Sequence, residues 1–571
     1  MNRLRGAVLT AVAVTGLTIA PAMAAGKPSV PAATKPPVIM NKSEVEVQIL
    51  ALNDFHGNLQ PPAGSSGRVG TVDAGGAEYL ATHVKALEAT NRNTVVVSAG
   101  DLIGASPLLS ALFHDEPTIE AMNQIGLDIN AVGNHEFDEG ADELLRMQNG
   151  GCHPTDGCLD GDGFAGADFE FLAANVVDEA SGDTIFPPYT IRNYNGAKVA
   201  FIGMTLEGTP LIVSPSGVAG LQFNDEADTV NALVPRLKQM GVSAVVVLVH
   251  EGGLPASGSD INTCTGISGP IVDIVERMDP RVDLVISGHT HQAYNCVIDG
   301  IPVTSALSFG RLVTDIDMRV DRAKKEVTSI AIQNKIVTRD VPKSPALTSL
   351  IDRYDAIAAP IANRDIGSIT ADITRANNAA GESALGDVIA DAQLDATDDP
   401  GFGDAVAAFM NPGGIRADLT YAGSSAGEGD GNVTYGEMFT VQPFGNSLVT
   451  LTLTGTQIDT LLEQQFDNPS PGSNRILQVS DGFTYTWSQS APTGSKVNIS
   501  SISINGVPID PSASYRVTVN SFLADGGDGF SVLLQGTNRL GGAVDTDALE
   551  AYFAASSPVS PGPQNRITAA P

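Results

Sequence analysis

The sequence predicts an α/β protein built from two domains. Its 571 residues exceed the length at which a single hydrophobic core usually stops growing, so two cores are expected. Short β-branched runs and helical stretches alternate before residue 344, and strands and helices are indicated again after residue 364, as in α/β folds. Hydrophobic residues make up 42% of the chain, which is enough to bury sheets and excludes a wholly disordered protein.

Six apolar runs in the first domain predict buried strands, because they are short, rich in β-branched residues and bounded by Gly, Asp or Asn. They cover residues 45–52, 94–98, 199–204, 244–249, 282–286 and 301–305. Helical stretches at 76–90 and 228–240 lie between them. The first domain is therefore expected to span residues 44–343.

A helix over residues 344–364 is predicted to connect the domains. It would present one apolar face, formed by Leu347, Leu350, Ile351, Tyr354 and Ile357. The second α/β domain follows at residues 365–555, with a helical stretch at 383–396. Residues 25–43, rich in Pro, Ala and Lys, are expected to form a disordered lead-in. Residues 556–571, rich in Ser, Pro and Ala, are expected to form a loose tail.

The N-terminus has the composition of a secretory signal peptide. Arg3 and Arg5 precede an apolar run at residues 6–20, and Ala22 and Ala24 fit the small-residue rule for cleavage after Ala24. The apolar run is shorter than the roughly 20 residues that cross a bilayer, which argues against the alternative of a membrane anchor. We expect a monomer that is exported to the periplasm or the medium.

The chain has four cysteines, which in an exported protein are interpreted first as disulfides. We predict that Cys152 pairs with Cys158 and Cys264 with Cys296. Free buried thiols are the alternative. A zinc site made of these four residues is not expected, because no CxxC pair occurs.

The charge balance narrows the class of partner. The chain carries 32 basic and 65 acidic residues, a formal net charge of −33. Such a surface repels the phosphate backbone that dominates nucleic-acid affinity, so polymeric DNA or RNA is not expected as a partner. A small anionic substrate would need metal ions or clustered arginines to reverse the sign of the charge locally.

Metal-binding residue types follow the ends of the predicted strands, where open α/β sheets place their ligand sites. The motifs are Asp54 with His56, Gly100-Asp101, Gly133-Asn134-His135-Glu136 with Asp138, His250, and Gly288-His289-Thr290-His291. Five of the chain's eight histidines lie in them. The Asp-x-His and His-x-His spacings are typical of extended segments, whose alternate side chains point the same way. A capping Asp or a hydrogen-bonded His would explain one motif, but not the whole set.

The order DxH, GD, GNHE, H and GHxH resembles the calcineurin-like metallophosphoesterase superfamily over residues 45–310. The resemblance implies that the first domain is a β-sandwich flanked by helices. It also implies two divalent metal ions, one held by Asp54, His56 and His291, the other by Asn134, His250 and His289, with Asp101 between them. Carboxylate, imidazole and amide ligands suit Zn, Mn, Co or Fe.

The same resemblance implies a catalytic role for His135. This residue follows the ligand candidate Asn134, so it would reach the phosphoryl group or the leaving oxygen. Asp138, three residues further on, would hold its imidazole in orientation. We therefore treat His135 and Asp138 as a catalytic dyad.

Three segments of the second domain resemble signatures of the bacterial 5′-nucleotidase family: NPGGIR at 411–416, VQPFGN at 441–446 and NSFLADGGDGF at 520–530. The resemblance implies that Gly413, Gly414 and Arg416 contact the phosphate of the substrate and that Phe444 and Phe522 stack on the two faces of the base. It also implies contacts from Asn446 and Asp528 to the ribose or base, and a substrate contact from Asn411. Core packing is the alternative for either Phe alone.

Three departures from the family pattern concern the substrate. Residues 375–387 contain one arginine, Arg375, where some relatives carry two for the phosphate. Asp387 stands where Asn is more usual, and Pro412 replaces a Gly. The expected activity is metal-dependent hydrolysis of nucleoside 5′-monophosphates, with UDP-sugars and 2′,3′-cyclic nucleotides as further candidate substrates. The alternatives are a two-metal esterase for a non-nucleotide substrate and an inactive nucleotide-binding surface protein.

Overall fold

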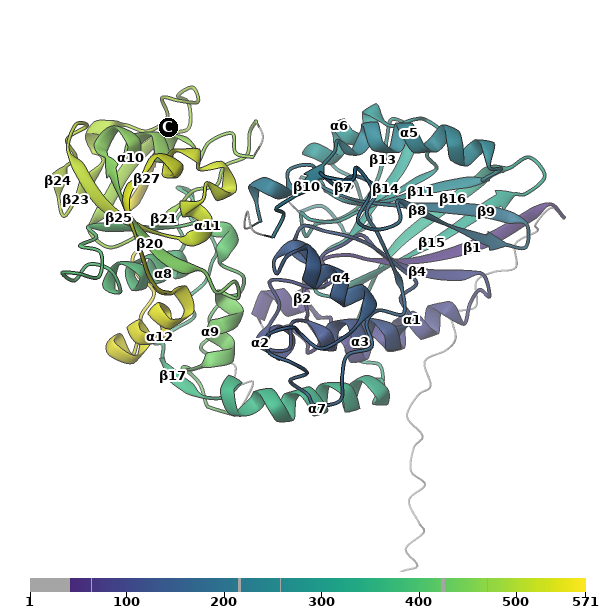
Figure 1. Cartoon of the computed structure of the whole chain (residues 1–571), viewed down its shortest axis with the longest axis horizontal. Helices are drawn as coiled ribbons and strands as arrows, with labels where there is room; N and C mark the ends of the chain where they lie inside the picture. The colour runs from purple at the N-terminus through teal and green to yellow at the C-terminus, as the bar shows by residue number, and fades with distance from the viewer. Residues whose placement is uncertain (1–41, 63, 214–216, 257, 423–426, 470) are drawn as a thin grey trace, which may run out of the picture.

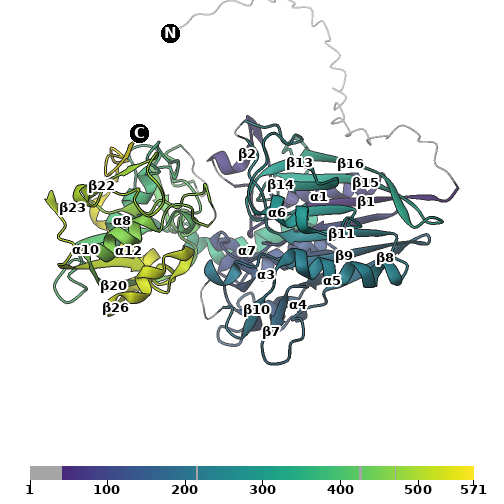
Figure 2. The same ribbon diagram turned by 90° about the horizontal axis from the view of Figure 1, so that it is seen from above.

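The protein forms two lobes joined by one long helix. The computed structural model describes residues 42–571 except 63, 214–216, 257, 423–426 and 470, so the expected signal peptide and nearly all of the lead-in lie outside the described residues. The helix α7 (Pro345–Ala362) runs along the lower edge in Figure 1 and passes from the first lobe to the second. Figure 2 shows the lobes side by side from above.

The first lobe is a sandwich of two six-stranded mixed sheets. In spatial order, the first sheet contains β16 (Glu326–Ile336), β15 (Leu312–Asp321), β1 (Glu44–Leu52), β4 (Thr94–Ser98), β5 (Ile129–Ala131) and β6 (Glu170–Leu172). The second contains β13 (Ala293–Ile298), β14 (Ile301–Ala306), β12 (Leu284–Ser287), β11 (Ala244–His250), β9 (Ala197–Thr205) and β8 (Tyr189–Tyr194). All six predicted runs form strands, in agreement with the expected sandwich.

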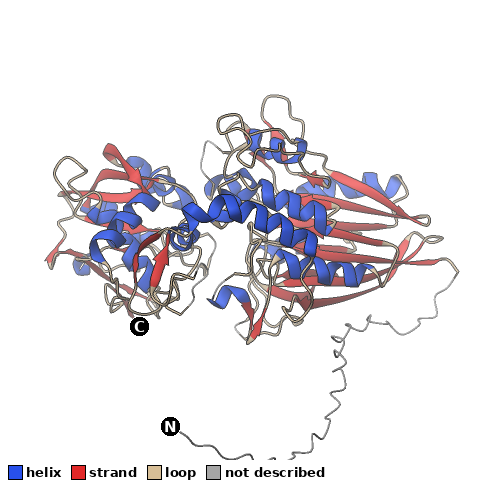
Figure 3. Ribbon diagram, turned by 90° about the horizontal axis from the view of Figure 1, so that it is seen from below, coloured by secondary structure: helices blue, strands red, loops and turns tan. Residues whose placement is uncertain are grey.

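Helices cover both outer faces of the sandwich, and Figure 3 shows one of these layers from below. The helices are α1 (Ala77–Glu88), α2 (Leu108–Ala111), α3 (Glu116–Ile125), α4 (Ala141–Asn149), α5 (Glu226–Gln239) and α6 (Pro270–Arg277). Strand β11 shows why the strand sequences are continuously apolar. Val246 and Leu248 face the core between the sheets, whereas Val245 and Val247 face the core under α5 and α6.

Parallel strands direct their carboxyl ends toward the same region of the sandwich. In the first sheet β1, β4, β5 and β6 are parallel, and in the second β9, β11, β12 and β14 are parallel. Two short ribbons, β2 (Arg68–Val69) with β3 (Val72–Asp73) and β7 (Val176–Asp178) with β10 (Leu221–Phe223), complete the lobe. The motif residues of the first domain follow these carboxyl ends or form the last residue of β11. Most lie in loops, whereas His135 and Glu136 lie in the short 3-10 helix η2 (His135–Phe137).

The second lobe is also α/β. Its five-stranded sheet has the order β21 (Gln478–Val479), β18 (Ala407–Met410), β25 (Ser514–Asn520), β20 (Ser447–Thr454) and β26 (Thr537–Val544). A four-stranded sheet contains β24 (Val507–Pro508), β23 (Ser503–Ile504), β22 (Phe483–Ser488) and β27 (Ile567–Ala570), and β17 (Asp365–Ser368) pairs with β19 (Asn432–Thr434). The helices are α8 (Ala384–Asp395), α9 (Tyr435–Val441), α10 (Gly455–Glu463), α11 (Ser521–Ala524) and α12 (Asp545–Ser556).

The connecting helix buries most of the predicted apolar face. Leu347, Leu350, Ile351 and Tyr354 pack into the core under α1 and α3. Ile357, by contrast, is 39% exposed, and Ala358 is buried in its place. The buried stripe thus turns slightly around the helix toward its C-terminal end.

The structure corrects the expectation that the C-terminal residues form a loose tail. Residues 556–571 include β27, which pairs in parallel with β22, and Ile567 is buried in the core of the second lobe. Arg566 anchors the strand through two hydrogen bonds to the Asp391 carboxylate, at 2.6 and 2.8 Å. The Ser- and Pro-rich composition misled the prediction, because the contacts that order the segment are made by two residues with partners distant in sequence.

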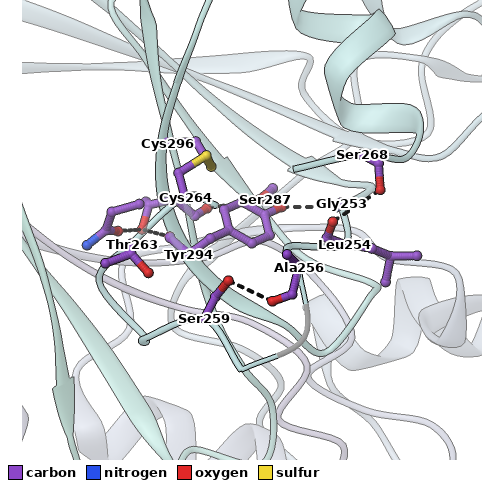
Figure 4. Close-up of a disulfide and its surroundings, with 12 residues drawn as sticks. Gly253, Leu254, Ala256, Ser259, Thr263, Cys264, Ser268, Ser287, Tyr294 and Cys296 are labelled. Carbon is purple, nitrogen blue, oxygen red and sulfur yellow. Dashed lines mark hydrogen bonds between the residues drawn. A yellow bond between two sulfur atoms is a disulfide. The ribbon is translucent and has the colours of Figure 1, made fainter. Parts of the chain in front are cut away.

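Both predicted cysteine pairs are formed as disulfides. The Cys264–Cys296 disulfide joins the loop after β11 to strand β13 (Figure 4). Nearby, the Tyr294 hydroxyl accepts a hydrogen bond from the Gly253 amide at 3.1 Å and bonds to Ser287 Oγ at 2.7 Å. These contacts brace the chain just beyond His250 and just before the Gly288–His291 motif.

Among the residues that the structure describes, no helix combines the length and the apolarity that crossing a bilayer requires.

Asp387 on α8 offers a test of buried charge. Its side chain is 2% exposed, and neither carboxyl oxygen has a hydrogen-bond partner in the described part of the chain. Burial raises the pKa of Asp387 to about 8, and Glu382 and Asp391 add to the shift although Arg566 opposes it. The folded state therefore holds a proton that the unfolded state releases above pH 4, so stability falls as pH rises from about 4 to 8.

Asp387→Asn is expected to stabilise the protein at pH 7 to 8 by roughly 1 to 3 kcal/mol, because a neutral amide needs no proton uptake on folding. The gain should shrink toward pH 4, which thermal unfolding across this pH range would measure. Asp391→Asn is the matched control one turn along α8, because it removes an ion pair with Arg566 and should destabilise the protein. Destabilisation by Asp387→Asn, or equal effects of the two variants, would contradict this account.

Candidate metal centre

Seven polar side chains converge where the carboxyl ends of the parallel strands meet. They are Asp54, His56, Asp101, Asn134, His250, His289 and His291, and all are buried or half-buried. Ligand atoms of Asp54, His56 and His291 lie within 4.8 Å of one another, and so do those of Asp101, His250 and His289. The first group is one of the two ligand sets expected from the sequence. The second contains Asp101 with His250 and His289, and Asn134, the third expected member of that set, lies with its Oδ1 3.0 Å from His289 Nδ1.

Contacts within the cluster join potential ligand atoms directly. Nε2 of His56 lies 3.1 Å from Nε2 of His291, which in turn lies 3.2 Å from Asp54 Oδ1. Asp101 Oδ2 lies 2.9 Å from His250 Nε2 and 3.6 Å from His56 Nε2. Asp101 therefore lies close to histidines of both groups.

Backbone carbonyls fix the orientation of two of the imidazoles. His56 Nδ1 lies 2.9 Å from the Gly104 oxygen, and His250 Nδ1 lies 2.7 Å from the Ala99 oxygen. Each carbonyl can only accept a hydrogen, so each imidazole carries a proton on Nδ1 and directs Nε2 toward the cluster. His250 Nε2 is fully buried and, among the described residues, has no well-oriented hydrogen-bond partner although the Asp101 carboxylate lies 2.9 Å away. A buried nitrogen beside a carboxylate suits a metal ligand.

Burial and charge set the protonation of the cluster. Burial lowers the pKa of His56 and of His291, and lowers the pKa of His289 to about 3, so these imidazoles are neutral. Burial alone would lower the pKa of His250 too, but the Asp101 and Asp54 carboxylates raise it to about 10. His250 therefore carries a proton that a divalent cation would displace. The donor set of carboxylates, imidazoles and one amide fits first-row transition metals.

The loops that carry the cluster are not extended, which corrects the reasoning from the Asp-x-His and His-x-His spacings. Asp54, His56, Asp101, His289 and His291 have φ angles of 50°, 47°, 52°, 69° and 53°. Left-handed conformations of residues other than glycine are unfavourable, and such strain concentrates at functional sites. The paired side chains reach one site through sharply turned loops rather than through the alternation of a strand.

Two motif glycines allow these loops to pack. A Cβ on Gly133 would overlap the Asp101 carboxylate, and a Cβ on Gly100 would lie 2.7 Å from His250 Nδ1. Gly100 also has a φ of 91°, which side-chain-bearing residues rarely adopt. The glycines of the GD and GNHE motifs are thus required by close approach to the ligand side chains.

Glu136 organises the loops, a role that was not assigned from the sequence. Its buried carboxylate accepts hydrogen bonds from the amides of Asp101 and Leu102, both at 2.9 Å, and of Gly133 at 2.7 Å. Burial and the nearby Asp101 charge raise the pKa of Glu136 to about 7. Its place in the GNHE motif was the only sequence signal for this function.

His135 and Asp138 form the expected pair. His135 Nδ1 lies 2.8 Å from Asp138 Oδ2, so the carboxylate orients the imidazole and leaves Nε2 as its free nitrogen. Burial lowers the pKa of His135, but the Asp138 and Asp101 carboxylates more than offset it and raise the pKa above its usual value. The His135 ring stacks on Phe444 of the second lobe, with centroids 5.7 Å apart.

A cavity of about 240 Å³ lies between the lobes and opens onto the cluster of candidate metal ligands. From the first lobe it is lined by Asn134, His135, Asp138, Ile212, Val213 and His289, and from the second by Asn411, Pro412, Gly413, Gly414, Arg416, Phe444, Asn446, Arg475, Asn520, Phe522 and Asp528. All the predicted substrate residues of the second domain line it except Arg375. Arg375 instead contacts the Ile415 oxygen and Ser66 Oγ, both at 3.4 Å.

A polar network at the far end of the cavity includes two residues that sequence reasoning missed. Asp528 accepts a hydrogen bond from Asn411 at 2.8 Å and forms an ion pair with Arg475. Asn520 donates to Asn411 at 2.9 Å. Arg475 lies outside the three signature segments, so no motif pointed to it. Asn520 lies within the third segment but was not singled out.

Comparison with known proteins agrees with this geometry. Residues 47–293 match the family model described as calcineurin-like phosphoesterase, and residues 360–535 match the model described as the C-terminal domain of 5′-nucleotidase. The chain belongs to the 5′-nucleotidase family. A solved 5′-nucleotidase precursor from Thermus thermophilus superposes with a TM-score of 0.76 at 26% identity, covering 92% of this chain and 99% of that one.

Two bacterial relatives of this 5′-nucleotidase family member are considerably longer. The endonuclease YhcR of Bacillus subtilis is 33% identical over 520 residues, and the cell wall protein Lmo0130 of Listeria monocytogenes is 32% identical over 530 residues. The matches cover 90% and 88% of this chain, but 40% and 66% of the length of those relatives.

Replacement of the carboxylate between the two groups of ligands should empty the centre. In Asp101→Asn, bound metal measured by elemental analysis is expected to fall from about two equivalents to less than one, because the charge that both ions would share is lost. Asp138→Asn is the control, since Asp138 contacts His135 rather than a ligand candidate. If both variants kept the wild-type metal content, Asp101 would not be a ligand.

Proposed function

We propose that this protein hydrolyses nucleoside 5′-monophosphates to nucleoside and phosphate with the help of two divalent metal ions. The observation that carries the proposal is that a single cavity is lined both by the ligand candidates Asn134 and His289 and by the aromatic residues Phe444 and Phe522. A substrate that fills this cavity can place a phosphate at the metal centre and a planar group between the aromatic rings.

The proposed ligands divide into two sets that share Asp101. Asp54, His56 and His291 would hold one ion, and Asn134, His250 and His289 the other. Calcineurin-like phosphoesterases use divalent metals. Two such ions held by these residues would activate water as the nucleophile at neutral pH and neutralise phosphoryl charge. Zn, Mn, Co and Fe all suit the donor set.

His135 is proposed to protonate the leaving oxygen. Asp138 holds Nδ1 at 2.8 Å, so the proton is delivered from Nε2, and the raised pKa of His135 favours the protonated form of the ring. Stacking of the imidazole on Phe444 ties this donor to the base-binding side of the cavity.

Residues of the second lobe are proposed to position the nucleotide. Arg416 would bind the phosphate, and Gly413 and Gly414 would let it approach the backbone. Phe444 and Phe522 would stack on the base, and stacking tolerates the identity of the base. Gly527 supports this arrangement, because a Cβ there would lie 2.5 Å from ring atoms of Phe522.

The contacts to the sugar are proposed to come from Asp528, Asn446 and Asn411. Asn411 and Arg475 already hold the Asp528 carboxylate, which leaves its remaining lone pairs for ribose hydroxyls. UDP-sugars and 2′,3′-cyclic nucleotides are further candidate substrates, since they also carry a base and a ribose.

A nuclease activity is the second candidate, because a relative at 33% identity is named an endonuclease. The net charge of −33 opposes it, since a polyanion would be repelled over most of the surface. Phosphate release from AMP, UMP, UDP-glucose and cyclic nucleotides, compared with fragmentation of single-stranded DNA on a gel, separates the candidates when the metal is varied and EDTA is the control. Cleavage of DNA in preference to AMP would overturn the proposal.

We further propose that the mature protein acts outside the cytoplasm. Two disulfides support this location, because they persist mainly in oxidising compartments.

His135→Asn should retain the wild-type metal content and lose most turnover. General acid catalysis typically contributes about 10²- to 10⁴-fold, so kcat for AMP is expected to fall by at least 100-fold. Elemental analysis of the same preparation verifies that the metal is retained. An unchanged kcat in a metal-replete variant would remove His135 from the mechanism.

Phe522→Ala should weaken nucleotide binding selectively. Loss of one stacking partner costs about 1 to 3 kcal/mol, which corresponds to a rise in KM for AMP of roughly 5- to 150-fold. Hydrolysis of β-glycerol phosphate, which has no ring to stack, serves as the matched control and should keep its KM. Equal losses for both substrates would indicate that Phe522 is a packing residue.

A further inference from the structure

Three arginine side chains lie near the contact between the two lobes, and the charge of Arg375 acts on both of the others. Arg311 belongs to the first lobe, and Arg375 and Arg416 belong to the second. Arg311 donates to the Arg68 oxygen at 3.2 Å, and Arg375 donates to Ser66 Oγ at 3.4 Å. Two guanidinium groups from different lobes therefore contact the same short segment. We call Arg311, Arg375 and Arg416 the arginine cluster.

One aromatic ring separates Arg311 from the metal centre. Its guanidinium carbon lies 5.4 Å from the centroid of Phe309. The Phe309 ring lies 5.4 Å from the ring of His291 and 6.0 Å from that of His56. Arg416 has a similar position in the second lobe, since its guanidinium lies over a ring that stacks on His135.

Counter-charges for the cluster are scarce. Among the described residues, neither Arg311 nor Arg416 lies within 4.0 Å of a carboxylate, and Arg375 reaches Asp418 only at 4.0 Å. The other acceptors of Arg311 are the neutral oxygen atoms of Ser308, at 3.0 and 2.7 Å. Burial, together with the charge of Arg375, lowers the pKa of Arg311 to about 10 and also lowers the pKa of Arg416.

Metal loading would make the positive charge of the cluster more exposed. The carboxylates that act on Arg416 are those of Asp101, Asp138 and Asp54. Two of these are proposed metal ligands, and divalent ions would neutralise them. Grouped guanidinium charges without carboxylate partners are unfavourable unless an anion joins them.

We propose that Arg311 completes, with Arg375 and Arg416, a phosphate-binding site to which both lobes contribute. The proposal rests on the proposed function only in taking the anion to be a phosphate. Arg311 supplies from the first lobe the positive charge that the segment 375–387 lacks with its single arginine. Because Arg311 and Arg375 repel each other across the contact between the lobes, a bound dianion stabilises that contact. The cluster also attracts anions locally to a protein whose net charge is −33.

Titration of the metal-loaded full chain with inorganic phosphate tests this site by calorimetry, without any turnover. Arg311→Gln is expected to raise the Kd by about tenfold, as for loss of one charge-assisted contact, and to make log Kd less dependent on salt. Arg311→Lys should retain most of the affinity. Arg339→Gln is the matched control, because Arg339 donates to the same segment at the Gly67 oxygen but has no arginine of the cluster among its interactions.

Arg311→Met carries the same test if the Gln variant does not fold. An unchanged Kd in Arg311→Gln, or an equal loss in Arg339→Gln, would overturn the proposal, since the latter would trace the effect to the shape of the segment. The results distinguish a failure of this proposal from a failure of the proposed function. Normal phosphate binding without hydrolysis of AMP refutes only the proposed function. AMP hydrolysis with an unchanged phosphate Kd in Arg311→Gln refutes only the role of Arg311.

Discussion

The buried carboxylate of Asp101 ties together the loops on which the site depends. Its side chain accepts the His135 amide at 2.9 Å and lies 2.9 Å from His250 Nε2. Its backbone oxygen accepts the His56 amide at 3.0 Å, and its amide donates to Glu136. A carboxylate at this depth must be surrounded by donors or cations, so none of these loops can move independently of the others. The imidazoles of His250 and His135 more than offset burial and hold the pKa of Asp101 well below its usual value.

The same constraint explains the backbone around the cluster. Loops from two sheets can converge on one carboxylate only if they turn sharply as soon as their strands end. Asp54 and His56 therefore adopt left-handed conformations, and Gly100 and Gly133 pack against side chains of the cluster without room for a Cβ. The cores on both sides of the two sheets hold the strand ends in place, which allows the strain to persist.

Recognition of a substrate depends on both lobes. The first lobe carries the metal cluster and the His135–Asp138 pair, whereas the second carries Phe444 and Phe522, and the cavity exists only where they meet. The positive charge near the site also comes from both lobes. The protein is strongly acidic as a whole, yet arginines from both lobes collect beside the metal centre. An anion is thus favoured at the contact between the lobes and disfavoured over most of the remaining surface.

The sequence alone determined six strands of the first lobe, the connecting helix, both disulfides and the residues that converge on the candidate metal centre. These features are encoded by local periodicity and by short motifs, and the six apolar runs all became strands. Only the tertiary structure decided the left-handed loops, the ordered strand β27, and the positions of Arg475, Glu136 and Arg311. Those features depend on contacts between residues far apart in the chain, as between Arg566 and Asp391, and the composition of a segment does not reveal which distant side chain will pack against it.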